Sequence, residues 1–146
     1  MTVATTDNKV NYVGDNSTTV FTFLFKVLDE THMTVYLDDV LTASGYTVNL
    51  NADQDTSPGG DVTFDTAPVT DATVTLLREV PLTQQVDYQP YDPFPAETHE
   101  SALDKLTMIT QQLSETLSRT SQSPPSSDLP PDLGDITVGN LTVTGS

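Results

Sequence analysis

Apolar and polar residues alternate in short runs along the first two thirds of the chain. The clearest run contains Phe21, Phe23 and Phe25 at every second position, a spacing that is typical of a half-buried β-strand. Residues with turn chemistry, such as Gly, Asp and Asn, separate the runs. The alternating pattern predicts strands at residues 9–14, 18–26, 33–37, 45–50, 61–64, 73–78 and 82–88.

Asp38 and Asp39 form a tight turn that predicts a hairpin leading into the short run at residues 40–41. About seven short strands within about 80 residues predict a mainly β fold, a small antiparallel β-sandwich or barrel. No helical pattern separates the strands, which argues against a βαβ arrangement. We therefore expect a β-rich head over residues 9–87, preceded by a flexible N-terminus at residues 1–8.

A segment rich in proline and aromatic residues, 88–95 (YQPYDPFP), follows the predicted strands, and we call it the strap. Each proline fixes its own φ angle and holds the residue before it in an extended conformation. Tyr88, Tyr91 and Phe94 project from this stiff segment and need a surface to pack on. That surface is either the chain's own sheet or a groove on a neighbouring subunit or another partner.

An amphipathic helix is predicted over residues 96–120. Glu97 and Glu100 stand in its first turn, where the helix dipole favours acidic side chains. At about 100° per residue, six apolar residues form a stripe about 120° wide along one side. The predicted interface consists of Ala102, Leu103, Leu106, Ile109, Leu113 and Leu117.

Burial of the four leucines and the isoleucine of this stripe would contribute on the order of 8–10 kcal/mol, at about 2 kcal/mol each. The stripe packs either on the chain's own sheet or on the same helix of sister chains. The leucine spacing also fits a coiled coil, and the breadth of the stripe favours three helices over two. A homotrimer is therefore expected.

The end of the chain has a different composition. Residues 121–135 are almost all Ser, Pro and Asp, which predicts a linker that cannot form a core. Residues 136–146 alternate again and contain a near-repeat of apolar and polar positions. We expect this segment to begin a β-rich region that continues past Ser146.

The formal net charge is −16, with only five Lys and Arg residues among the 146 of the chain. A nucleic-acid partner is excluded because a protein that binds nucleic acid needs cationic side chains to neutralise the phosphates. An anionic membrane surface is excluded for the same reason, and no apolar run is long enough for a membrane-spanning helix. The acidity serves either solubility or attraction to a basic partner surface. Cysteine is absent, so the chain forms no disulfide bonds.

Three features suggest chemistry, and each has a plainer interpretation. Asn51, Asp53 and Asp55 resemble the start of a calcium-binding loop, but the Gly and the bidentate Glu that such a loop requires are missing, so the loop is either solvated or a weak Ca²⁺ site. The Asp38–Asp39 pair is either a turn or an acid–base pair. His99 either packs against the helix surroundings or meets its copies at a trimer axis. We predict no catalytic, cofactor-binding or metal-binding residues, and no cofactor.

Several segments, in order, resemble the N-terminal domain of tail fibres and tailspikes from short-tailed bacteriophages (podoviruses). These segments are YVGD at 12–15, FTFLF at 21–25, VYLDD at 35–39, GYTV at 45–48, SPGG at 57–60 and LREVPLTQ at 77–84. The most specific is YQPYDPFPAETHESALDKL at 88–106. The resemblance covers about residues 9–120.

The resemblance implies a structural virion protein. Such domains anchor a homotrimeric fibre or spike to the virion tail, where adaptor and nozzle proteins receive it. The distal part of the full protein binds the host surface, and in some spikes it degrades capsule polysaccharide. Localisation in the virion tail, after assembly in the cytoplasm of the bacterial host, is expected. The family has no catalytic motif in this region.

Two other functions are compatible with a β-rich head. A ligand-binding or carbohydrate-binding β-sandwich module would be stabilised by its ligand. A glycosidase fragment would need a cleft with two carboxylates, and about 80 residues offer little material for such a cleft. The anchoring module uses every feature of the sequence, so it is the function we expect.

Overall fold

The computed structural model describes residues 3–84, 86–91, 93–119, 136–138 and 141–143. The chain divides into two compact units, residues 1–112 and residues 113–146. The predicted linker at residues 121–135 lies outside the described residues. Within the part of the chain that the structure describes, no helix is both long and apolar enough to span a lipid bilayer.

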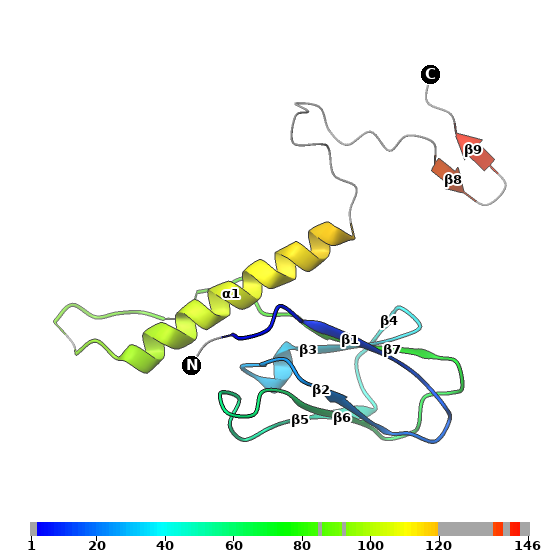
Figure 1. Cartoon of the computed structure of the whole chain (residues 1–146), viewed down its shortest axis with the longest axis horizontal. Helices are drawn as coiled ribbons and strands as arrows, with labels where there is room; N and C mark the ends of the chain where they lie inside the picture. Colours follow the sequence, from blue (N-terminus) through cyan, green and yellow to red (C-terminus); the bar gives the residue numbers. More distant parts are fainter. Residues whose placement is uncertain (1–2, 85, 92, 120–135, 139–140, 144–146) are drawn as a thin grey trace. The chain divides into compact units, whose positions relative to one another are not determined.

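The first unit contains two antiparallel sheets, as Figure 1 shows. One sheet has the strand order β1-β7-β3-β4 and the other has the order β2-β6-β5. The prediction of a mainly β fold, with a small antiparallel sandwich or barrel as the head, is confirmed, and the head has two antiparallel sheets. The strands are β1 (Lys9–Val13), β2 (Val20–Phe23), β3 (Met33–Leu37), β4 (Val40–Thr42), β5 (Tyr46–Leu50), β6 (Gly60–Phe64) and β7 (Thr73–Arg78), with a 3-10 turn η1 at Glu30–His32.

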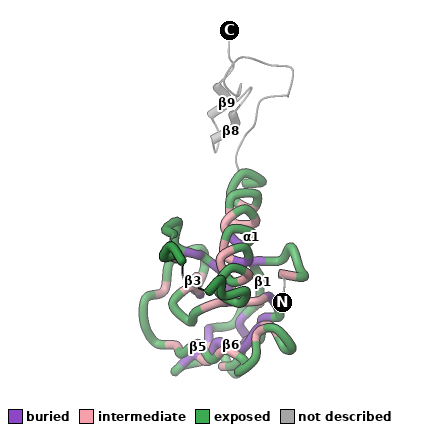
Figure 2. Tube along the Cα trace, turned by 90° about the vertical axis from the view of Figure 1, so that its left-hand side faces the viewer, coloured by how far each residue is buried: buried purple, intermediate pink, exposed green. Residues whose placement is uncertain are grey.

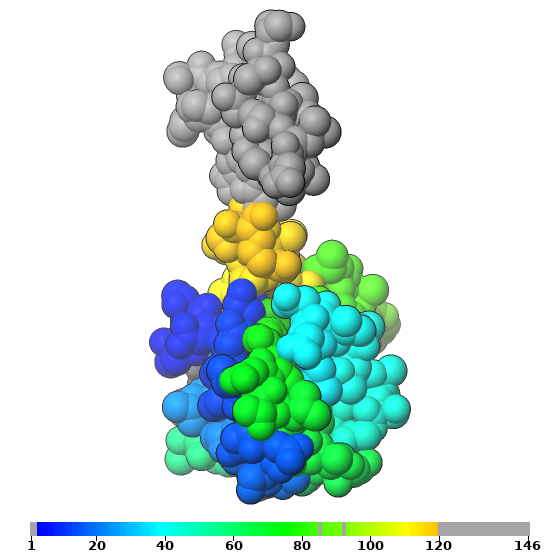
Figure 3. Space-filling view, turned by 90° about the vertical axis from the view of Figure 1, so that its right-hand side faces the viewer, coloured from blue at the N-terminus to red at the C-terminus, as the bar shows by residue number. Residues whose placement is uncertain are grey.

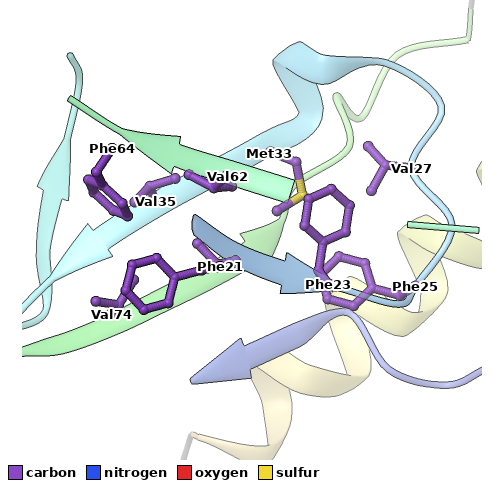
Figure 4. Packing of buried hydrophobic residues seen from close by; sticks show 10 residues of the cluster. Phe21, Phe23, Phe25, Val27, Met33, Val35, Val62, Phe64 and Val74 are labelled. Carbon is purple, nitrogen blue, oxygen red and sulfur yellow. The ribbon is translucent and has the colours of Figure 1, made fainter. Parts of the chain in front are cut away.

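The hydrophobic core lies between the two sheets. Val35 and Leu76 face it from one sheet, and Phe21 and Val62 face it from the other. These side chains are at most 4% exposed, because alternate residues of each strand point to the same face. Figure 4 shows Phe23, Phe25 and Met33 gathered at one end of the core, and Phe21, Phe64 and Val74 at the other.

The predicted hairpin is present between β3 and β4. Asp38 and Asp39 both have positive φ angles, 51° and 63°, as a two-residue turn between right-twisted strands requires. The Asp38 side chain accepts a hydrogen bond from the backbone N–H of Thr73 (2.8 Å), which ties the turn to β7. In Figure 3 the residues of this hairpin, in cyan, lie beside the green residues that lead into β7.

Two predicted strands differ in the structure. The strand predicted at 18–26 ends at Phe23, because the backbone beyond it bonds to side chains instead of a neighbouring strand. The carbonyl of Lys26 accepts from Arg78 (2.7 Å), and the N–H of Val27 donates to Gln54 (3.2 Å). The strand predicted at 82–88 is wrong: its described residues form no strand and run alongside the helix instead.

The long helix α1 spans Ala96–Ser118, so the predicted helix is confirmed. Glu97 stands in its first turn, and the N–H of His99 donates to the carbonyl of Pro95 (3.1 Å). In the second unit, β8 (Ile136–Val138) and β9 (Leu141–Val143) form an antiparallel pair.

Candidate interaction site on the helix and the strap

The helix contacts the head through a polar face, and its central contact is an ion pair. The Lys26 ammonium lies 2.6 Å from a carboxylate oxygen of Asp104 and 2.5 Å from one of Asp55. The side chains of Lys26 and Asp104 are only 11% and 7% exposed. One turn along the helix, Met108 is completely buried. A largely desolvated pair beside a buried methionine fixes which side of α1 faces the head.

A buried arginine holds the next turn of the helix. Arg78 is 1% exposed, and its guanidinium donates to the Lys26 carbonyl (2.7 Å) and to the side-chain oxygen of Gln111. It also lies 5.7 Å from the centre of the Phe25 ring, within cation–π range. Burial lowers the pKa of Arg78 to about 10, so the group remains charged at neutral pH.

Two further hydrogen bonds extend this contact beyond the arginine. Gln111 donates to the carbonyl of Thr5 (2.7 Å), which brings the N-terminal segment against the helix. The side-chain oxygen of Gln112 accepts from the N–H of Val80 (2.8 Å). We call the contacts of Lys26, Arg78, Asp104, Met108, Gln111 and Gln112 the polar lock.

The leucine stripe does not pack on the chain's own sheet. Leu103, Leu106, Leu113 and Leu117 are 50%, 59%, 51% and 53% exposed, whereas Ala102 and Ile109 are intermediate. Two residues along a helix correspond to a rotation of about 200°, so Leu106 points away from the side of Asp104. Figure 2 shows exposed positions in green along α1, alternating with intermediate ones in pink. Leu103, Leu106 and Leu113 therefore keep about half of their surface exposed beside the head, and packing on sister helices stays a prediction.

The strap packs on the first turns of α1. The rings of Tyr88 and Phe94 are stacked with centroids 5.8 Å apart, and the Phe94 ring lies 5.0 Å from that of His99. The Tyr88 hydroxyl lies 3.3 Å from Nδ1 of His99. Tyr91 differs from both: its side chain is fully exposed and its φ angle is 72°, which is uncommon for a residue with a side chain. The printed ring contacts of the strap are thus with the helix, and docking of the strap to a partner stays a prediction.

An apolar groove of about 590 Å³ separates α1 from the segment that was predicted to be a strand. Its lining includes Leu82, Val86 and Tyr88 on one side, and Ala102, Leu106 and Ile109 on the helix. The Lys105 ammonium bonds to the carbonyl of Thr83 and joins the two sides. The groove thus lies between the segment after β7 and the first half of α1.

The side-chain oxygens of the candidate calcium loop accept hydrogen bonds from donors of this same chain. Asp53 accepts from the N–H of Asp55 (2.9 Å), from the N–H of Thr56 (3.0 Å) and from the Thr56 hydroxyl (2.7 Å), and these bonds lower its pKa. Asp55 pairs with Lys26, and Gln54 bonds to the backbone of Gly59. Within the described ranges, no three acidic, His or Cys side chains are grouped as a metal site would need.

The polar lock was not identified from the sequence, although a signal for it exists. Only five Lys and Arg residues occur in the chain, and Lys26 and Arg78 each follow a strongly apolar run. A cation that ends a core strand must find a buried partner or stay in solvent. That reasoning selects both residues, but it does not reveal that the partners lie on the helix.

Known proteins give an independent comparison. No family model matches the chain. The chain is 31% identical over 135 residues to the tail spike protein of Salmonella phage epsilon15, and the match covers 85% of the chain. The chain spans about 12% of the length of that relative. This similarity confirms the predicted resemblance to podovirus tailspike proteins, is consistent with an N-terminal tailspike module, and supports a structural protein of the phage tail.

Proposed function

We propose that the chain is the module that anchors a trimeric tailspike or tail fibre to the virion tail. The observation that carries the proposal is the orientation of α1. The helix is held to the head by the polar lock, and the leucines on its other side remain about half exposed. An exposed apolar stripe on a well-held helix marks an interaction surface.

The energetics support association of the stripe with other copies of the helix. About half of each leucine remains to be buried, which contributes roughly 1–2 kcal/mol per side chain. Association itself costs several kcal/mol, so several leucines from each copy must take part. The stripe offers four leucines, Leu103, Leu106, Leu113 and Leu117, over 15 residues of one helix.

The strap is the surface we assign to the tail partner, an adaptor or nozzle protein. Tyr91 is fully exposed, and Phe94 is 65% exposed. Exposed aromatic side chains on a stiff segment lose little conformational entropy on binding, and aromatic residues are enriched at the centres of interfaces. The distal part of the full-length protein would then act on the host surface.

Binding to spike-deficient tails tests the anchoring role. Purified chain is mixed with virions that lack their spikes, and co-sedimentation is measured. We expect saturable binding that full-length spike displaces. Tyr91→Ala should weaken this binding at least tenfold, whereas Val40→Ala, which truncates an exposed residue of β4, should leave it unchanged. A self-associating chain that fails to co-sediment contradicts the anchoring role.

The alternative function is a ligand-binding or carbohydrate-binding sandwich. It predicts that a polysaccharide or Ca²⁺ raises the melting temperature of the head. The acids of the loop at residues 51–60 already bond to donors of their own chain, as shown for Asp53 and Asp55, so we expect no shift with Ca²⁺.

A further inference from the structure

We infer that the groove beside α1 holds the helix of a neighbouring copy of this chain, with the described residues 82–84 and 86–88 as its outer wall. The inference rests on the proposed self-association and goes beyond it, because it adds a second surface to the interface. The wall consists of Leu82, Val86 and Tyr88, and the floor of Ala102, Leu106 and Ile109.

The groove and the leucine stripe form one continuous surface. Leu103 and Leu106 belong to both. Ala102 and Ile109 lie on the flank of the stripe that faces the wall, which explains why they are less exposed than the leucines. A helix laid along the stripe therefore also contacts the wall, unless it lies wholly on the opposite flank.

The distribution of charge identifies the occupant. The Asp, Glu and Lys residues of α1 are Glu97, Glu100, Asp104, Lys105 and Glu115. At about 100° per residue, none of them falls within about 90° of Leu106. Half of the helix surface is thus free of fixed charge, in a chain with a net charge of −16.

A second copy fits such a surface better than a basic partner does. Copies of a strongly acidic chain repel each other wherever their acids meet, so they can associate only through an uncharged face. A basic partner would instead gain most from the acidic surfaces elsewhere on the chain. The uncharged face is also complementary to itself, since apolar side chains of similar size meet from both sides.

Symmetry defines which part of the neighbour enters the groove. In the proposed trimer, a three-fold axis that runs along the helices keeps them parallel, and one flank of each helix meets the opposite flank of the next. The flank with Ala102 and Ile109 faces the wall, so the neighbour presents its Leu103 side. Tyr88 contacts His99, and Thr83 contacts Lys105. Val86 stands between Thr83 and Tyr88 in the sequence, so it lies along the helix between His99 and Lys105. Val86 of one copy should therefore lie near Leu103 of the next.

Disulfide cross-linking between two tagged versions of the chain tests this contact. The chain has no cysteine, so each introduced thiol is unique. One version carries Val86→Cys and the other Leu103→Cys, and they are co-expressed and oxidised. We expect a disulfide that joins the two tags, at a yield at least tenfold above that of a matched pair with Val13→Cys, an exposed valine of β1.

The outcomes separate this inference from the proposed function. The protein could self-associate while the pair with Val86→Cys yields no more cross-link than the pair with Val13→Cys. That result would overturn the inference and leave the proposed function standing. A monomeric parent protein overturns the proposed self-association together with the inference. A second measurement avoids cysteine chemistry: Val86→Asp should weaken self-association at least tenfold and Val13→Asp should leave it unchanged, and equal effects of the two variants overturn the inference.

Discussion

At the residue scale, two glycines of the head have positive φ angles that residues with a side chain rarely adopt. Gly59 has a φ of 104°, and a Cβ atom there would lie 2.1 Å from the carbonyl oxygen of Phe23. Gly45 also has a positive φ, 86°, but a Cβ atom there would meet nothing within 4 Å. A residue with a side chain would therefore have a strained backbone at both positions, but only at position 59 would its Cβ atom also clash with a neighbouring backbone.

Gly59→Ala should lower the free energy of unfolding by more than 2 kcal/mol, because it adds a backbone clash to a strained conformation. Gly45→Ala is the matched control and should cost about 1 kcal/mol, from the strain alone. Urea unfolding of both variants measures the difference. Equal losses would show that the approach of Gly59 to Phe23 is not tight.

His32 should give the head a pH dependence near neutrality. Burial lowers the pKa of its imidazole, whose Nδ1 is buried without a hydrogen-bond partner; Asp29 opposes this effect and Lys105 adds to it. The unfolded chain binds a proton near pH 6.5, and the folded chain binds it only at lower pH. The stability from neutral His32 is therefore fully present above about pH 6.5 and is lost as the pH falls through the folded-state pKa.

Unfolding free energies of the wild-type chain and of His32→Asn between pH 7 and pH 5 check this effect. The wild-type chain should lose stability over that range, and the variant should lose less. The carboxyl groups with lowered pKa, those of Asp15, Asp29 and Asp53, keep their stabilising effect over this range and lose it only as the pH falls below their ordinary pKa of 3.8. Equal slopes for the two proteins would remove His32 from this account.

At the element scale, the polar lock decides which side of α1 remains available. Asp104→Asn should weaken the contact with Lys26, which keeps Asp55 as its partner, and should cost on the order of 1–2 kcal/mol. Hydrogen exchange of the helix amides between residues 96 and 112 should speed up, while the core strands stay protected.

Glu97→Gln is the control for that variant, because it removes an acid from the exposed first turn of the same helix. It should leave exchange in the middle of the helix unchanged. If both variants behave alike, the ion pair of Asp104 is not what holds the helix to the head.

The sequence predicts the elements of this fold better than their contacts. Alternation places β3 and β7 at their observed bounds, because Met33 and Val35 of β3 and Val74 and Leu76 of β7 enter the core at every second position. The same alternation at 82–88 misleads, because Leu82 and Val86 line a groove beside α1 and pair with no strand. The leucine stripe is predicted, but the face that docks on the head is not, since Lys26, Arg78 and Asp104 meet only through the tertiary fold.

At the scale of the whole molecule, Leu106→Asp should dissociate the assembly. The substitution places a charge in the centre of the uncharged face of α1, and an unpaired buried charge costs several kcal/mol. Leu106 is 59% exposed in the single chain, so the head should still fold. Sedimentation velocity should show a single small species, and the circular dichroism of the head should be unchanged. An assembly of unchanged mass would place the contact elsewhere.

Self-association of the chain through the exposed face of α1 is tested most directly by the molar mass in solution. Light scattering at several concentrations should give three times 15.8 kDa for the unmodified chain. A mass of 15.8 kDa at every concentration would contradict the account, because the leucine stripe and the groove would then remain open to solvent.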